Sequence, residues 1–152
     1  FWVVILRKNT GFSAVRLGGH APNFAGGHKC NPQDSELTMI SITSEYGLYL
    51  YTGKVDMRKG IDGLCGIISE DLGHNPRKPK GVYVFGGRNP RVKKVLIREY
   101  NRYELTTIRL DEGRFLRPLT DPERVGGKIC WSDFVMLTEC AASTSAVVKY
   151  MD

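Results

Sequence analysis

The sequence predicts an α+β fold, in which a small antiparallel β-meander sheet packs against one main helix, with a short C-terminal helix. Three observations support this prediction. One segment carries apolar residues at helical spacing, several short apolar runs are joined by short loops, and the chain has 152 residues. This length suggests one domain whose core is stable without a metal or a disulfide.

The N-terminal part of the chain differs from the rest. Residues 1–38 are rich in Gly, Asn and Pro and have no sustained hydrophobic period, which is typical of loops or disorder. Met39 opens the first well-patterned region, so we expect a functional domain over residues 39–140. Residues 1–38 are then an extension, or an upstream translation without function. Residues 141–152 are expected to form a loose C-terminal tail.

The main helix is expected over residues 56–72. Asp56 is a good N-cap residue, and Gly73 followed by Pro76 gives the usual stop signals. The apolar residues of this segment fall at helical spacing: Met57, Ile61, Leu64, Cys65, Ile68 and Leu72. Just before it, residues 48–52 form an aromatic and apolar run that ends at Gly53, and we expect a strand there.

Further strands are expected at residues 82–85, 92–98, 104–110 and 114–117. Short loops separate them, and short loops favour antiparallel neighbours because parallel strands need long crossovers. Gly113 is expected in the left-handed conformation of a hairpin loop. Residues 132–139 predict the short C-terminal helix. One face of the sheet would then pack against the main helix, and the other face or its loops would carry basic residues.

The positive charge of the chain is concentrated in one segment. The net charge is +6 overall, whereas residues 77–117 contain twelve Lys or Arg and four Asp or Glu. Such a local excess indicates a basic face that attracts polyanions. Aromatic residues, Phe115 among them, alternate with the bases, and the two types together can contact phosphates and nucleobases. The candidate phosphate contacts in this segment are Arg88, Arg91, Lys93, Lys94, Arg98, Arg114 and Arg117.

The start of the main helix has an unusual composition. Arg58 and Lys59 fall in the expected first turn, where the helix dipole disfavours cations by about 0.3–1 kcal/mol each. An anion bound by the free N–H groups, by these two residues and by Lys54 would reverse that balance, and Gly60 and Gly63 would let it approach closely. Alternatively, Arg58 pairs with Asp56 or Asp62, and the glycines let the helix sit close to the sheet.

Catalytic chemistry has little support in the sequence. There is no Walker A loop, no H-E-x-x-H and no G-x-S-x-G motif, so we expect no catalytic residues, no cofactor and no metal. Asp56 and Asp62 are candidate nuclease acids, but six residues apart they lie on different helix faces. The cysteines are widely spaced, and we expect four reduced thiols: Cys30, Cys65, Cys130 and Cys140.

No apolar run approaches the roughly 20 residues that span a bilayer, and the N-terminal "FWVVIL" lacks the features of a signal peptide. We therefore expect a cytoplasmic protein without a membrane partner, associated with the nucleoid when it binds DNA.

Three motifs carry a family resemblance. "YTGKVDMRKGIDGL" (51–64), "VYVFGGRNPRVKKVL" (82–96) and "RLDEGRFLRP" (109–118) follow one another in the chain. They resemble the signatures of the small TnpB-type accessory proteins of bacterial transposons of the insertion sequence 66 family, over about residues 40–139. The RNA-guided nuclease also called TnpB is a different, larger protein. Tryptophans frequent in the family are replaced here at Ile97-Arg98 and Arg117, which makes the surface more basic.

The resemblance implies an accessory role beside a separate, larger transposase that carries the catalytic acids. The leading hypothesis is a non-enzymatic factor that binds DNA, in particular transposon ends. The second hypothesis is a protein–protein adaptor that docks the transposase or another co-encoded transposon protein without binding DNA. A third, a cryptic nuclease, would require Asp56 or Asp62 for metal-dependent cleavage.

Overall fold

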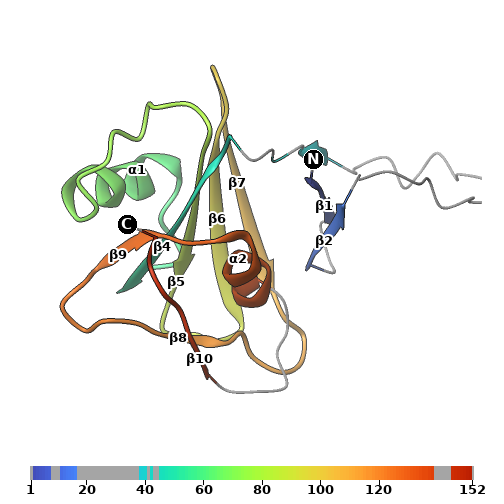
Figure 1. Ribbon diagram of the computed structural model, residues 1–152, viewed down its shortest axis with the longest axis vertical. Coiled ribbons are helices and arrows are strands. Elements are labelled where there is room, and N and C mark those ends of the chain that lie inside the picture. Colours follow the sequence, from blue (N-terminus) through green and yellow to red (C-terminus); the bar gives the residue numbers. More distant parts are fainter. Residues whose placement is uncertain are drawn as a thin grey trace, which may run out of the picture.

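The computed structural model of the protein describes residues 2–7, 11–16, 38–40, 42, 45–138 and 145–151. Cys30 and Cys140, two of the four cysteines that we expected to be reduced thiols, lie outside these residues. Among the described helices, none is long and apolar enough to cross a membrane. Figure 1 shows the arrangement of the strands and helices.

A five-stranded sheet with the strand order β7-β6-β5-β4-β9 forms the centre of the protein. Its strands are β4 (Gly47–Lys54), β5 (Gly81–Gly86), β6 (Val92–Arg98), β7 (Tyr103–Arg109) and β9 (Gly126–Lys128). The helices are α1 (Ile61–Glu70) and α2 (Trp131–Thr138). The predicted α+β class is confirmed, and α2 agrees with the predicted short helix within one residue at each end.

The sheet is mixed, whereas we expected an entirely antiparallel one. Strands β5, β6 and β7 form the predicted antiparallel meander, but β4 pairs with β5 in parallel, with Leu48 opposite Val82. The reason is the connection between them, since residues 55–80 include α1 and are long enough for a parallel crossover. The inference from short loops to antiparallel neighbours therefore holds only for β5, β6 and β7.

The main helix begins at Ile61, five residues later than predicted. Asp56 does not cap it. Instead, the Asp56 carboxylate accepts a hydrogen bond from the Arg58 backbone N–H at 2.9 Å. The backbone carbonyl of Asp56 accepts a second one from the Lys59 N–H at 3.0 Å. These two bonds close a separate turn, which competes with helix formation. The N-cap is Gly60, whose extended backbone precedes the first helical turn.

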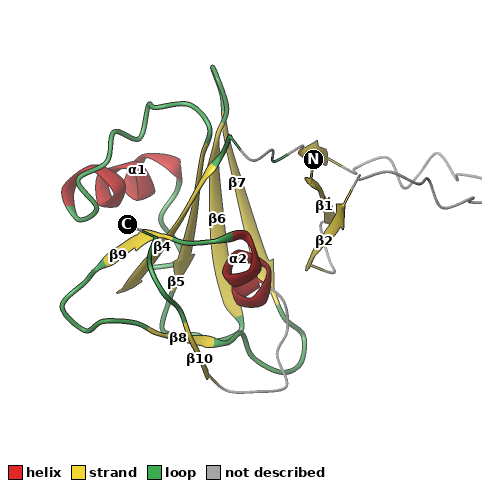
Figure 2. Cartoon of the chain, viewed as in Figure 1, coloured by secondary structure: helices red, strands yellow, loops and turns green. Residues whose placement is uncertain are grey.

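Both faces of the sheet are covered, and each has its own core (Figure 2). Leu64 and Ile68 of α1 pack on one face beside Phe85 and Leu96. Phe134 and Leu137 of α2 cover the other face, together with inward-facing residues of β4, β5 and β6. The expectation that one open sheet face carries the basic residues is therefore wrong. Its alternative, that the loops carry them, agrees with the structure.

The predicted strand at residues 114–117 is displaced toward the C-terminus. Phe115 and Leu116 are buried, and the regular strand is β8 (Arg117–Leu119), which pairs in parallel with β10 (Ser145–Val147). Pro118 fits in this two-stranded sheet because no central ladder needs its N–H. Gly113 has the predicted positive φ, 75°. Residues 145–147, expected in a loose tail, are thus paired in β10, while the domain boundaries at residues 38 and 140 stay predictions.

Three further strands lie in the N-terminal segment, where we expected no regular structure. They are β1 (Trp2–Arg7), β2 (Gly11–Arg16) and β3 (Thr38–Ile40), and they form a separate sheet with the order β2-β1-β3. The run Val3-Val4-Ile5 has the β-branched composition that favours a strand.

Candidate functional site

A groove of about 600 Å³ opens at the end of the sheet where β4 and β5 finish and β6 starts. Lys54 ends β4, Arg88 lies in the β5–β6 turn, and Arg117 begins β8. The parallel pairing of β4 with β5 is what brings their two C-terminal ends to the same place. The groove is lined by residues 50–54, 86–90, 92, 93, 115–122 and 124.

The three motifs that carry the family resemblance meet at this groove, and most of its lining residues belong to them. The first two motifs touch at Gly87, because a Cβ there would lie only 2.9 Å from both the Met57 side chain and the Val55 carbonyl oxygen. The second and third motifs are joined by a hydrogen bond from the Phe115 N–H to the Pro90 carbonyl, at 2.9 Å. Segments far apart in sequence thus build one continuous site.

The cations of the groove have few acidic neighbours. Within the described residues, no ion pair involves Lys54, Arg88 or Arg117, and all three are exposed. Arg124 also lines the groove, and its guanidinium lies over the Tyr150 ring, 5.5 Å from the ring centroid. The positive charge of Lys54, Arg88 and Arg117 makes the groove suitable for an anionic ligand.

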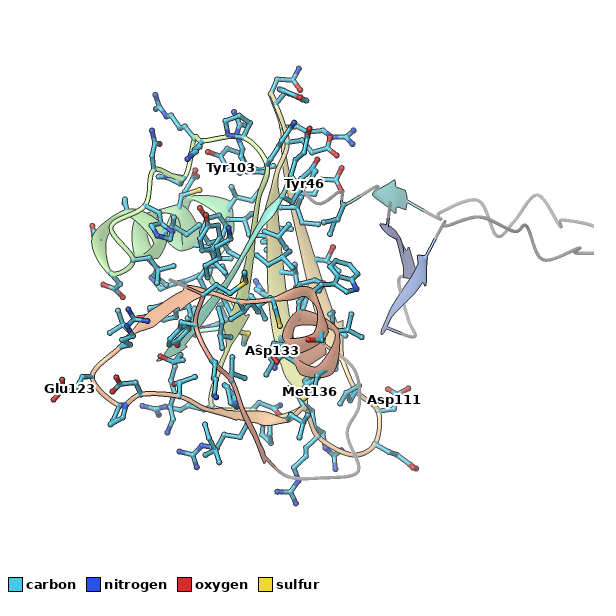
Figure 3. All side chains as sticks on the ribbon, viewed as in Figure 1. Tyr46, Tyr103, Asp111, Glu123, Asp133 and Met136 are labelled. Carbon is cyan, nitrogen blue, oxygen red and sulfur yellow. The ribbon has the colours of Figure 1, made fainter. Side chains whose placement is uncertain are left out.

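Among the described residues, one carboxylate lines the groove, and it has a local structural role. The Asp121 side chain accepts a hydrogen bond from the Glu123 N–H at 3.0 Å, which holds the turn between β8 and β9. Glu123 itself points away from the protein body at the outer edge of this turn (Figure 3). These acids therefore do not pair with Lys54, Arg88 or Arg117.

Lys93 and Lys94 are buried, in contrast to the exposed cations of the groove. The two residues are 6% and 8% exposed, and their side chains leave β6 on opposite faces. The Lys93 ammonium donates to the Leu137 carbonyl of α2 at 2.5 Å, and the Lys94 ammonium donates to the Lys59 carbonyl before α1 at 2.7 Å. Lys93 thus ties α2 to the sheet, and Lys94 ties the turn before α1 to it, so both buried lysines have a structural role.

Lys93 suits its position next to α2. The last carbonyls of a helix lack internal partners and carry partial negative charge, which a nearby cation stabilises. The last turn of α2 has no basic residue of its own, so Lys93 supplies the charge from the sheet. Burial lowers the pKa of Lys93 to about 8.

The turn before α1 explains the cations that we expected in the first helical turn. Arg58 forms an ion pair with Asp56 at 2.9 Å. Its side-chain and backbone hydrogen bonds lower the pKa of the Asp56 carboxyl to about 2. The first turn of α1 contains Asp62 instead, which the dipole favours. The structure agrees with the second interpretation of Arg58, in which it pairs with Asp56.

The remaining predicted residues are spread over the molecule. Arg98 pairs across the sheet with Gly81, and thus lies roughly 17 Å along β6 from Lys93, at the end opposite the groove. Arg91 donates to the Asp111 carbonyl at 3.1 Å, and neither Arg91 nor the exposed Arg114 lines the groove. Any part that these three take in nucleic-acid binding stays a prediction.

The predicted glycines differ in their surroundings. A Cβ at Gly53 would lie 2.5 Å from the Tyr51 ring, so the lack of a side chain there is needed for packing. A Cβ at Gly60 would meet nothing within 4 Å, and one at Gly63 would meet the Lys59 side chain at 3.2 Å. Neither Gly60 nor Gly63 lets α1 approach the sheet more closely.

Two groove residues had no signal in the sequence. Arg124 and Leu119 stand outside the three motifs and are separated from Lys54 by more than sixty residues. The pairing of β9 with β4 brings this part of the chain to the groove, and the Thr52 N–H bonds the Val125 carbonyl at 2.9 Å. The burial of Lys93 and Lys94 could have been predicted from the sequence. The apolar run of β5 does not alternate with polar residues, which indicates a sheet covered on both faces, and β6 is the neighbour of β5 in that sheet.

The described part of the chain contains free thiols but no cluster of metal-ligating side chains. No three His, Cys, Asp or Glu side chains gather there in a way that could hold a metal ion. Cys65 and Cys130 are free thiols, as expected, and burial is the main cause that raises the pKa of Cys65.

Comparison with known proteins agrees with the three motifs. No curated protein and no solved structure matches the chain significantly. The model of one protein family, described as IS66 Orf2 like protein, matches residues 46–146. This range includes β4 to β9, both helices and every residue that lines the groove. The chain therefore belongs to the IS66 Orf2-like family, the TnpB-type proteins of insertion sequence 66 elements, and this membership implies an accessory role in transposition.

Proposed function

We propose that this protein is a non-enzymatic DNA-binding factor that assists transposition, and that the groove at the end of β4 and β5 is its DNA contact. The observation that carries the proposal is a set of exposed groove cations that have no carboxylate partner among the described residues: Lys54, Arg88 and Arg117. The family implies the transposition context. The proposed partners are transposon-end DNA and the separate transposase.

Phosphate binding follows from this arrangement by elementary electrostatics. Arg and Lys side chains that neutralise phosphates release condensed counterions, so affinity for DNA falls as salt rises. Phosphate contacts of this kind position a protein on DNA without reading its sequence. The groove thus supplies affinity, and selection of transposon ends falls to base contacts or to the transposase.

The test is a fluorescence anisotropy titration of the full chain with labelled DNA, carrying either a transposon end or an unrelated sequence, from about 50 to 200 mM salt. The logarithm of the affinity should fall linearly with the logarithm of the salt concentration. Arg88→Ala and Arg117→Ala should each reduce the slope by about 1, which is about an eightfold loss of affinity at 0.1 M salt.

A matched control is Lys78→Ala. Lys78 is exposed like the groove cations, but it lies in the loop that leads to the opposite end of β5, and its loss should leave the slope unchanged. Absence of binding at low salt, or a flat salt dependence, would contradict the proposal. In that case, transposase pulled down by this protein after nuclease treatment would favour the adaptor role.

A further inference from the structure

We infer that the groove takes a single strand of DNA in preference to a duplex, with the phosphates on the cations and the bases against apolar lining. This inference rests on the proposed function and narrows it to one form of DNA. It starts from two properties of the groove, its concave shape and its mixed lining of cations with exposed apolar residues.

The shape of the groove is the first argument. A duplex displays its base edges only inside its own grooves, and proteins reach them with protruding helices or ribbons. A site of about 600 Å³ between β8 and the ends of β4 and β5 is hollow and not protruding. Such a site can meet a duplex only through phosphates, whereas a single strand can lie in it with its bases accessible.

The apolar lining is the second argument. Leu119 in β8 lines the groove and is 49% exposed, so it presents apolar surface inside the groove. Pro90, Pro118 and Pro122 add apolar surface to the same lining. A duplex that binds only through its phosphates would leave this apolar surface uncovered. Unstacked bases would cover it, because their faces are apolar and are stabilised by side chains that cover them.

The cations and the apolar surface lie on the same stretch of chain. Arg117, Leu119 and Arg124 all line the groove and lie within eight residues of one another in the chain. Lys54 and Arg88 lie at the ends of β4 and β5, beside the same groove. This order, with charge beside apolar surface, fits the alternation of phosphates and bases along one strand.

The experiment compares oligothymidylate of 20 nucleotides with a duplex of equal length, each bound to the full chain at 0.1 M salt. Single-stranded DNA should bind at least about tenfold more tightly than the duplex. Leu119→Ala should weaken single-strand binding by about fivefold and leave duplex binding and the salt slope unchanged. Met151→Ala is the matched control, because Met151 is 50% exposed and does not line the groove.

The outcomes separate this inference from the proposed function. Equal or tighter binding of the duplex overturns the inference and leaves the proposed function standing. The same holds if Leu119→Ala behaves like Met151→Ala, or if polyglutamate of equal charge displaces the strand as well as DNA does. If neither form of DNA binds at low salt, both proposals fail.

Discussion

At the scale of single residues, two adjacent lysines show how misleading a local charge pattern can be. Lys93 and Lys94 contribute to the basic segment of the sequence, yet both ammonium groups donate to backbone carbonyls inside the protein. A buried ammonium is tolerated only with such partners. Lys93 also lies over the Phe115 ring, 5.2 Å from its centroid, which adds a favourable cation–π contact.

Burial of Lys93 predicts a specific pH dependence of stability. Its pKa is about 8 in the folded protein, against 10.5 for an ordinary lysine. Between these pH values the unfolded chain holds the extra proton, so the free energy of unfolding should increase as pH rises from 8 to 10.5, by up to about 3 kcal/mol. Below pH 8 both states are protonated and this dependence disappears.

The measurement is urea unfolding of the wild type and of Lys93→Met at several pH values between about 7 and 10.5. Methionine keeps a long apolar chain but does not titrate, so the variant should lack the increase that Lys93 causes. All other groups titrate alike in the wild type and the variant. The difference between their free energies of unfolding therefore reports on Lys93 alone. Parallel profiles for the two proteins would contradict the prediction.

At the scale of elements, the segment between β4 and α1 packs on the β5–β6 turn. The Val55 N–H bonds the Gly86 carbonyl at 2.9 Å, Lys94 holds the Lys59 carbonyl, and Gly87 lies against Met57. The "VDMRKG" segment therefore has a structural function in this contact, through the Val55 N–H, the Met57 side chain and the Lys59 carbonyl.

The two adjacent glycines of the β5–β6 turn provide a matched pair for testing this contact. Gly87→Ala should lower the free energy of unfolding by about 1–3 kcal/mol, because the new Cβ would lie 2.9 Å from the Val55 carbonyl oxygen and from the Met57 side chain. Gly86→Ala should change it by less than about 0.5 kcal/mol, since a Cβ there meets nothing within 4 Å. Equal urea midpoints for the two variants would show that this contact is not tightly packed.

At the scale of the whole molecule, the C-terminal segment closes the core on the α2 face. Strand β10 pairs with β8, Val148 is 4% exposed, and the Met151 N–H bonds the Lys128 carbonyl of β9 at 2.7 Å. Residues 145–151 therefore join β8 to β9, the two strands on either side of the turn that carries Arg124 (Figure 1).

This role of the C-terminal segment predicts opposite behaviour for two neighbouring residues. Val148→Asp should cost at least about 3 kcal/mol of stability, because it buries a carboxylate in an apolar core. Lys149→Asp should stay within about 0.5 kcal/mol, since Lys149 is exposed. Thermal unfolding followed by circular dichroism measures both. A small, equal effect of the two variants would show that the segment is a loose tail after all.

The sequence by itself determined the elements whose signals are local. The helical spacing of apolar residues predicted α1, although not its start. Short apolar runs predicted the strands β6 and β7, and short loops predicted the antiparallel order of β5 to β7. The three motifs were enough to indicate the family. The sequence also showed that Lys54, Arg88 and Arg117 were candidate cations, although it named several others with equal weight.

Only the tertiary structure decided which cations share a site and which are buried. The parallel pairing of β4 with β5 brings Lys54 and Arg88 to one end of the sheet, and the pairing of β4 with β9 adds Arg124. Two covered faces bury Lys93 and Lys94, while the length of β6 separates Arg98 from the groove. The physical reason is that charge and hydrophobicity belong to residues, whereas proximity and burial depend on strand pairings between distant segments, which local patterns do not specify.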